Sequence, residues 1–211
     1  MSRERSHLAE PPNDLDGFPV WHVHAGTALF RVARRGAGPW WFASGSGRFD
    51  LVAPRGTCYL ADEAAVAVIE AFGGLRPGVT LSAADVESRV LWTLPLPEQC
   101  DAADTTARAS RRFGVTAELG TAVPYDLPRR WAAAFAAAHL GGVRYRARHD
   151  PAGGRALALF GLAGERRRWR KGRPEPLDEA LLVEAFGPVA VRPRPASTDL
   201  DPLLDAPPTG S

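Results

Sequence analysis

Four residues in the first third of the chain have side chains that could together handle a nucleotide: Arg31, Arg48, Tyr59 and Glu70. Guanidinium groups bind phosphates through paired hydrogen bonds, and aromatic rings, here also those of residues 40–42, stack on planar bases. A carboxylate beside a sugar stabilises positive charge that develops at the anomeric carbon. These residue types suit a ligand with phosphates, a ribose and a planar base, although their spacing is also compatible with purely structural roles.

Residues 40–73 must position most of this set. A Gly/Ser loop at residues 44–47 precedes Arg48. A short apolar strand at residues 57–61 then contains Tyr59. The loop and the strand would place a guanidinium and a phenol on one wall of a small-molecule site.

Glu70 lies in the last turn of a helix expected over residues 63–72, for which Asp62 is the predicted N-cap. A carboxylate in that turn is disfavoured by the helix dipole, by roughly 0.3–1 kcal/mol. Residues that break a local rule are often functional. The alternative is a surface glutamate that pairs with an arginine.

The remaining pattern predicts one α+β domain with mixed or antiparallel sheets and flanking helices, because strands and helices alternate without a regular βαβ order. We expect this domain at residues 18–192, between disordered tails at 1–17 and 193–211. Further strands are expected at 20–23, 27–33, 88–94, 143–148, 155–160 and 189–191. Further helices are expected at 104–113, 126–139 and 177–186, with a short one opened by a Ser82-x-x-Asp85 capping box.

Composition excludes several classes of function. The net charge of +2, from 26 basic and 24 acidic residues, gives no case for nucleic-acid binding, and the basic run at 166–173 is expected to be a solvated loop. No apolar run is long enough for a membrane span or a signal peptide, so a cytoplasmic protein is expected. Cys58 and Cys100 form no metal motif, and the pair His22 and His24 lacks a third ligand, so no metal site is expected.

Several segments, taken in order, resemble the RES domain family. They are LFRVAR with Arg31, GRFD at residues 47–50, GTCYLAD at 56–62 and Glu70 eight residues further on. The resemblance continues through YDLPRRWAAAFAAAHLGGVRYRARHD and ALALFG, and covers about residues 28–161. This family is the toxin half of bacterial toxin–antitoxin pairs whose antitoxin is an Xre-like protein.

The resemblance implies an ADP-ribosyltransferase-like fold and NAD⁺ as the substrate, with no prosthetic group. Such enzymes split the nicotinamide–ribose bond with water or phosphate as the acceptor, and some modify a protein. Arg31, Tyr59 and Glu70 match the family's arginine, strand tyrosine and glutamate, and Arg48 matches its loop arginine. The implied roles are phosphate binding for the arginines, nicotinamide binding for Tyr59 and stabilisation of the ribosyl cation for Glu70.

One position departs from the family pattern. The family serine would stand in the segment Tyr145-Arg146-Ala147-Arg148, where Ala147 has no hydroxyl to bind the nucleotide or orient Glu70. A lost hydrogen bond to a charged group costs roughly 1.5–3 kcal/mol, which is about ten- to a hundredfold in rate. Ser44 or Ser46 could substitute. An NAD⁺-degrading enzyme is therefore the preferred hypothesis, and the alternatives are a weak or inactive nucleotide- or antitoxin-binding protein and an ADP-ribosyltransferase acting on a protein.

Overall fold

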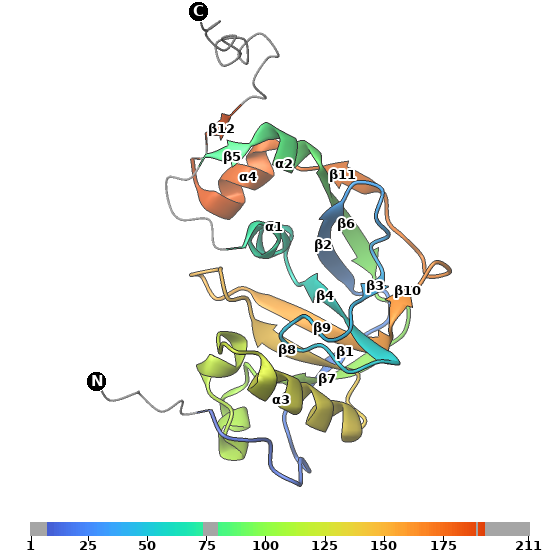
Figure 1. The fold of residues 1–211 in the computed structure, drawn as a ribbon, viewed down its shortest axis with the longest axis vertical. Helices are drawn as coiled ribbons and strands as arrows, with labels where there is room; N and C mark the ends of the chain where they lie inside the picture. Colours follow the sequence, from blue (N-terminus) through green and yellow to red (C-terminus); the bar gives the residue numbers. More distant parts are fainter. Residues whose placement is uncertain (1–7, 74–79, 189, 193–211) are drawn as a thin grey trace, which may run out of the picture.

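The computed structural model describes residues 8–73, 80–188 and 190–192. Within these residues, eight strands form one sheet in the order β1-β7-β8-β9-β4-β2-β6-β11 (Figure 1). The neighbours β7 and β8 are parallel, and every other neighbouring pair is antiparallel. The strands are β1 (Val20–Val23), β2 (Ala28–Arg34), β4 (Arg55–Ala61), β6 (Arg89–Pro95), β7 (Cys100–Asp104), β8 (Gly142–Arg146), β9 (Arg155–Leu162) and β11 (Pro174–Pro176). The predicted α+β class with a mixed sheet and flanking helices is confirmed.

Short elements complete the fold. Two further two-stranded pairs join β3 (Trp41–Phe42) to β10 (Gly164–Glu165) and β5 (Leu81–Ser82) to β12 (Val191–Arg192). The helices are α1 (Ala64–Phe72), α2 (Ala83–Glu87), α3 (Asp126–Ala137), α4 (Glu179–Phe186) and the 3₁₀ helices η1 (Arg108–Phe113) and η2 (Ala117–Gly120). The basic run at residues 166–173 is a loop, as predicted.

The sheet opens like a fork between β2 and β4. These two strands pair at a single position, Phe30 with Ala61, whereas β4 pairs with β9 along its whole length. Arg31 follows Phe30 directly and therefore lies where the two strands diverge. A split of this kind leaves room for side chains and a ligand between the two halves of the sheet.

The helices α1 and α3 cover the same face of the sheet. Side chains alternate between the two faces of a strand, so residues two positions apart share a face. Val143 and Tyr145 of β8 pack with Trp131 and Phe135 of α3. Ala147, two residues beyond Tyr145, packs in a cluster with α1 residues. In Figure 1, α1 lies above and α3 below on this side, with strands β4, β9 and β8 between them.

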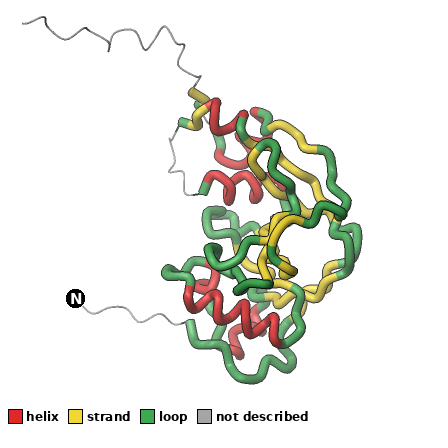
Figure 2. The backbone as a smooth tube through the Cα atoms, turned by 45° about the vertical axis from the view of Figure 1, so that its right-hand side comes forward, coloured by secondary structure: helices red, strands yellow, loops and turns green. Residues whose placement is uncertain are grey.

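The opposite face is closed by curvature of the sheet itself. Val23 of β1 and Leu94 of β6, from strands near opposite ends of the sheet, share a core cluster with Cys58 and Leu157 from its middle. Figure 2 shows the strands bending around this core while the helices lie to the other side. The helical face is therefore where a site can open to solvent.

Three local predictions hold only in part, for identifiable reasons. Asp62 does not cap α1; Glu63 occupies the N-cap position, and the Asp62 carboxylate instead accepts a hydrogen bond from Arg144 (2.9 Å). Ser82 stands at the N-cap of α2 but makes no side-chain cap bond. Of the helix predicted at 104–113, only residues 108–113 are helical, as the 3₁₀ helix η1, because β7, with Ala102 and Ala103 buried in the sheet, runs to Asp104 and a turn follows at 105–107.

The N-terminal segment differs from the expected disordered tail at 1–17. Leu8 is buried in the core around α3, and the indole N–H of Trp131 donates to the carbonyl of Ala9 (2.9 Å). Arg130 forms a two-point ion pair with Glu10. Residues 8–10 are thus tied to α3, whereas residues 1–7 and the predicted tail at 193–211 lie outside the described residues. No helix in the described part of the chain is both long and apolar enough to cross a membrane.

Candidate active site between helices α1 and α3

Two adjoining hollows on the helical face hold all four residues predicted from the sequence. Arg31 lines the smaller one, of about 190 Å³, and Arg48 lines the larger one, of about 420 Å³. Tyr59 and Glu70 line both, together with Tyr145. Tyr59 of β4 and Glu70 of α1 therefore lie between the hollow that Arg31 of β2 lines and the hollow that Arg48 of the loop lines.

Glu70 is held by the backbone of the opposite wall. Its Oε1 atom accepts a hydrogen bond from the N–H of His149 (3.0 Å), in the loop that follows β8. No arginine forms an ion pair with it among the described residues, so the alternative of a surface glutamate paired with arginine does not describe its environment. The carboxylate is half-buried and remains open to both hollows.

Arg48 is a buried cation at the edge of the larger hollow, with only 9% of its surface exposed. One Nη atom donates to the carbonyl of Ala122 (2.7 Å), and the guanidinium lies 4.7 Å from the ring centroid of Tyr125. Burial lowers the pKa of this guanidinium, and the nearby Arg148 acts in the same direction, while Tyr125 opposes the change. An arginine stays protonated despite such a shift, so the hollow contains a fixed positive charge.

Tyr59 fixes the loop that carries Arg48. Its hydroxyl donates to Asp50 Oδ1 (2.7 Å) and accepts the N–H of Phe49 (2.9 Å). Burial, followed by the charge of Asp50, raises the Tyr59 pKa, so the phenol stays protonated. A side chain at Gly47 would collide with this hydroxyl and with the Asp50 carboxylate. The Tyr59 hydroxyl thus binds the loop through Asp50 and Phe49, which leaves the aromatic ring of Tyr59 to contact a ligand in the hollows.

Arg31 ties the strand pair β3 and β10 to the fork. One Nη atom lies 2.8 Å from the carbonyl of Pro39, 3.0 Å from that of Trp41 and 2.8 Å from Cys58 Sγ. Burial raises the pKa of the Cys58 thiol, which keeps it neutral beside the cation. One nitrogen of the Arg31 guanidinium is therefore committed to the protein, and the residue also lines the smaller hollow.

The aromatic residues at 40–42 do not line either hollow. Trp40 and Phe42 are buried and pack edge-to-face against Trp169 at centroid distances of 5.1 and 5.7 Å. Trp41 is exposed, and its carbonyl holds Arg31. The rings at the site belong instead to tyrosines from β4, β8 and the start of α3.

Sequence reasoning did not single out several residues of the site, which are Tyr125, Tyr145, Arg148 and His149. Tyr145 stands two positions before Ala147, on the same face of its strand. Burial and then the charge of Glu70 raise the Tyr145 pKa, so its hydroxyl stays protonated. The signal for Tyr145 and Arg148 was present, because both belong to the segment compared with the family serine motif.

The position of the missing serine is buried. Ala147 is 5% exposed, belongs to the same buried cluster as Val66 and Ala67, and lines neither hollow. Of the two substitutes, Ser46 lines the larger hollow, whereas the Ser44 hydroxyl donates to the carbonyl of Leu51 (3.0 Å). Residue 46 thus places a serine at the larger hollow, and Glu70 takes its hydrogen bond from a backbone amide.

The histidines considered as metal ligands are not part of the site. His22 Nδ1 lies 2.7 Å from Asp101 Oδ1, at the exposed edge formed by β1 and β7. In the described ranges, no group of three or more His, Cys, Asp or Glu side chains is arranged to hold a metal ion.

A comparison with protein families decides the identity of the domain. The model of the RES domain matches residues 28–178, which is most of the chain. The chain belongs to the RES domain family. The match extends beyond the 28–161 segment in which the resemblance was recognised, and reaches the residue that precedes α4.

Comparison with solved structures supports the same fold. The RES domain is similar to a chain of the M. tuberculosis MbcT–MbcA toxin–antitoxin complex, with a TM-score of 0.56 and 16% sequence identity. The similarity covers 79% of this chain and 92% of the other. No curated protein sequence matches the chain. At this identity the likeness establishes the fold, and function has to be argued from the site.

Proposed function

We propose that this RES-domain protein degrades NAD⁺ by cleaving its nicotinamide–ribose bond, as the toxin of a toxin–antitoxin pair. The observation that carries the proposal is the position of Glu70. Its carboxylate is held by the His149 amide and faces two hollows that also contain Arg48, Tyr59 and Tyr145. Family membership and the shared fold with the MbcT–MbcA chain support this assignment.

The side chains that line the two hollows match the chemistry of the pyrophosphate, the nicotinamide and the ribose of NAD⁺. Arg48 and Arg148 border the larger hollow and suit the pyrophosphate, because guanidinium groups bind phosphate oxygens in pairs. The rings of Tyr59 and Tyr145 suit the flat nicotinamide. Glu70 lies between these groups and suits the ribose. NAD⁺ is the substrate here, and the proposed reaction needs no prosthetic group.

Glu70 would act by electrostatic stabilisation. When the bond between the nicotinamide nitrogen and ribose C1′ breaks, its electron pair leaves with nicotinamide, which becomes neutral. Positive charge then develops on C1′ and the ring oxygen, where a fixed carboxylate lowers the barrier. An oxygen of water or phosphate bonds to C1′, and the water or phosphate gives up a proton. The products are nicotinamide and ADP-ribose or its 1″-phosphate.

The His149 amide would take the place of the missing serine in orienting Glu70. His149→Pro removes this N–H donor, whereas His149→Ala keeps it. We expect His149→Pro to lower kcat about ten- to a hundredfold, which is the change in rate that corresponds to the free energy of one hydrogen bond to a charged group. The His149→Ala variant should stay within about threefold of wild type. Nicotinamide release at saturating NAD⁺ measures both rates.

Thermal melting of the two His149 variants serves as the control, because proline can also disturb the loop. The comparison is valid if His149→Pro melts within a few degrees of His149→Ala. Equal loss of kcat in both variants would show that the imidazole matters, and that the amide does not orient Glu70.

A second candidate function is nucleotide or antitoxin binding without turnover, and Ala147 is the observation that favours it. If the serine were essential, Ala147→Ser would raise nicotinamide release by tenfold or more. Because Ala147 lines neither hollow and Glu70 already has a donor, we expect a change of less than about threefold. A hydroxyl buried there without a partner should cost roughly 1–3 kcal/mol of stability.

The partner of the proposed toxin would be an antitoxin, which we propose to be of the Xre-like type. The support is family membership and the toxin–antitoxin complex that contains the similar chain. Expression of the chain alone should then arrest growth, and Glu70→Gln should not. Growth that is unaffected by wild-type protein at the same expression level would contradict the toxin role.

A further inference from the structure

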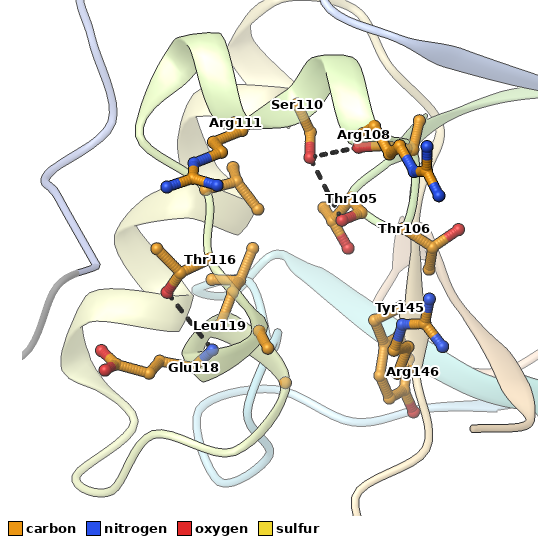
Figure 3. A pocket seen from close by; sticks show the side chains of 14 residues that line it. Thr105, Thr106, Arg108, Ser110, Arg111, Thr116, Glu118, Leu119, Tyr145 and Arg146 are labelled. Carbon is orange, nitrogen blue, oxygen red and sulfur yellow. Dashed lines mark hydrogen bonds between the residues drawn. The ribbon is translucent and has the colours of Figure 1, made fainter. Parts of the chain in front are cut away.

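A third hollow, of about 870 Å³, lies beside the candidate active site and plays no part in the proposed cleavage. It is formed by residues 105–107, by η1 and η2, and by the end of β8 (Figure 3). Tyr145 is the one described residue that it shares with the two active-site hollows. The third hollow is thus a neighbouring but separate space.

Positive charge dominates its rim. Arg108, Arg111 and Arg146 line it, and all three are exposed. Their guanidinium groups form no hydrogen bond or ion pair with other residues that the structure describes. In Figure 3, Arg111 lies on the left of the hollow and Arg108 and Arg146 lie on the right. The lining carboxylate, that of Glu118, accepts a hydrogen bond from the N–H of Leu8 (3.1 Å).

The backbone that carries these arginines is firmly fixed. The Ser110 hydroxyl donates to the carbonyl of Ala107 (2.7 Å), and that of Thr105 donates to the carbonyl of Arg144 (2.6 Å). The Thr106 hydroxyl donates to Asp104 (2.6 Å). These bonds tie the turn before η1 to β7 and β8. Side chains that start from such a turn lose less conformational freedom when they bind a ligand.

The floor is apolar and the volume is that of a small-molecule site. Val115 and Leu119 are buried beneath the rim. Ligand sites usually have volumes of about 300–1,000 Å³, mostly apolar walls and a few convergent polar groups. The lining of the hollow has three arginines and one carboxylate, and this excess of positive charge favours an anion, because each guanidinium can bind two phosphate oxygens.

We propose that this hollow binds a phosphate-bearing small molecule of nucleotide size, at a site separate from the one that would cleave NAD⁺. Phosphate oxygens would lie between the three arginines, and the rest of the molecule would cover the apolar floor. The concave shape favours a compact ligand over an extended acidic polypeptide.

Calorimetric titration with ADP tests this proposal. We expect the double variant Arg108→Ala/Arg111→Ala to weaken ADP binding about tenfold or more, since each arginine makes charge-assisted bonds. The matched control is Arg112→Ala, which removes the same charge from η1 at an exposed residue outside the hollow. It should change the Kd less than about twofold. Arg146→Ala removes a rim charge from a different element and should also weaken binding.

All titrations are repeated in an Arg48→Ala background, so that binding at the active site does not mask the result. The effect of the double variant should persist there, whether or not the protein cleaves NAD⁺. Equal weakening by Arg112→Ala, or no weakening by the double variant, would overturn the proposal. Tighter binding of a hexaglutamate peptide than of ADP would also overturn it, in favour of an acidic partner segment.

Discussion

Replacing Glu70 by glutamine is expected to lower nicotinamide release on the order of 100-fold or more, the usual cost of removing a group that stabilises transition-state charge. Glutamine has the same shape, and its amide oxygen can still accept the N–H of His149. The variant therefore loses the negative charge and little else. The KM for NAD⁺ should change much less than kcat, because the charge on the sugar develops only as the bond breaks.

The matched control for this experiment is Glu63→Gln. Glu63 is an exposed residue at the N-cap of α1, the helix that also carries Glu70, and its side chain makes no cap bond. Its replacement should leave kcat within about twofold of wild type. If Glu70→Gln keeps more than a third of wild-type kcat, Glu70 does not stabilise the ribosyl cation.

Replacing Asp50 by alanine is expected to give the largest loss of stability, about 3–5 kcal/mol. Asp50 is buried, and its carboxylate accepts the N–H groups of Ser46 (3.0 Å) and Gly47 (2.7 Å) and the hydroxyl of Tyr59 (2.7 Å). Alanine would leave three donors without a partner, and each costs roughly 1–3 kcal/mol. For a chain of this size, such a loss lowers the Tm by about 10 °C.

Chemical denaturation of three variants separates this network from a general effect of charge. Tyr59→Phe removes one of the three donors and also the acceptor of the Phe49 N–H, so it should cost less than Asp50→Ala but clearly more than Asp14→Ala. Asp14→Ala removes an exposed carboxylate that accepts a single local N–H, that of Asp16. It should cost less than about 0.5 kcal/mol. An Asp50→Ala loss no larger than that of Asp14→Ala would show that the carboxylate does not hold the loop.

The sequence predicted the elements that follow a simple periodic pattern. The strand at residues 57–61 and the helix at 126–139 are β4 and α3, with small shifts at their ends. Asp62 looked like an N-cap, but the pattern could not show that Arg144, far along the chain, would bind its carboxylate. The segment at 104–113 becomes helical only from residue 108, as η1, because β7 extends to Asp104 between β1 and β8, and burial by such remote neighbours leaves little local signal.

Residue type and family pattern selected four residues that the fold brings near one another. Arg31, Arg48, Tyr59 and Glu70 do line adjoining hollows. The hydrogen bond between Glu70 and the His149 amide was not predictable, because a backbone donor is present at every non-proline residue and depends on how the chain folds. The burial of Ala147 also depends on how the chain folds, so the sequence alone could not show that this residue lines neither hollow.

The most direct test of the account is product analysis of NAD⁺ incubated with purified wild-type protein, with and without phosphate. We expect one nicotinamide released for each ADP-ribose or ADP-ribose 1″-phosphate formed, at a rate that Glu70→Gln reduces on the order of 100-fold or more. NAD⁺ that binds in calorimetry but yields no nicotinamide above the Glu70→Gln background would contradict the proposed cleavage.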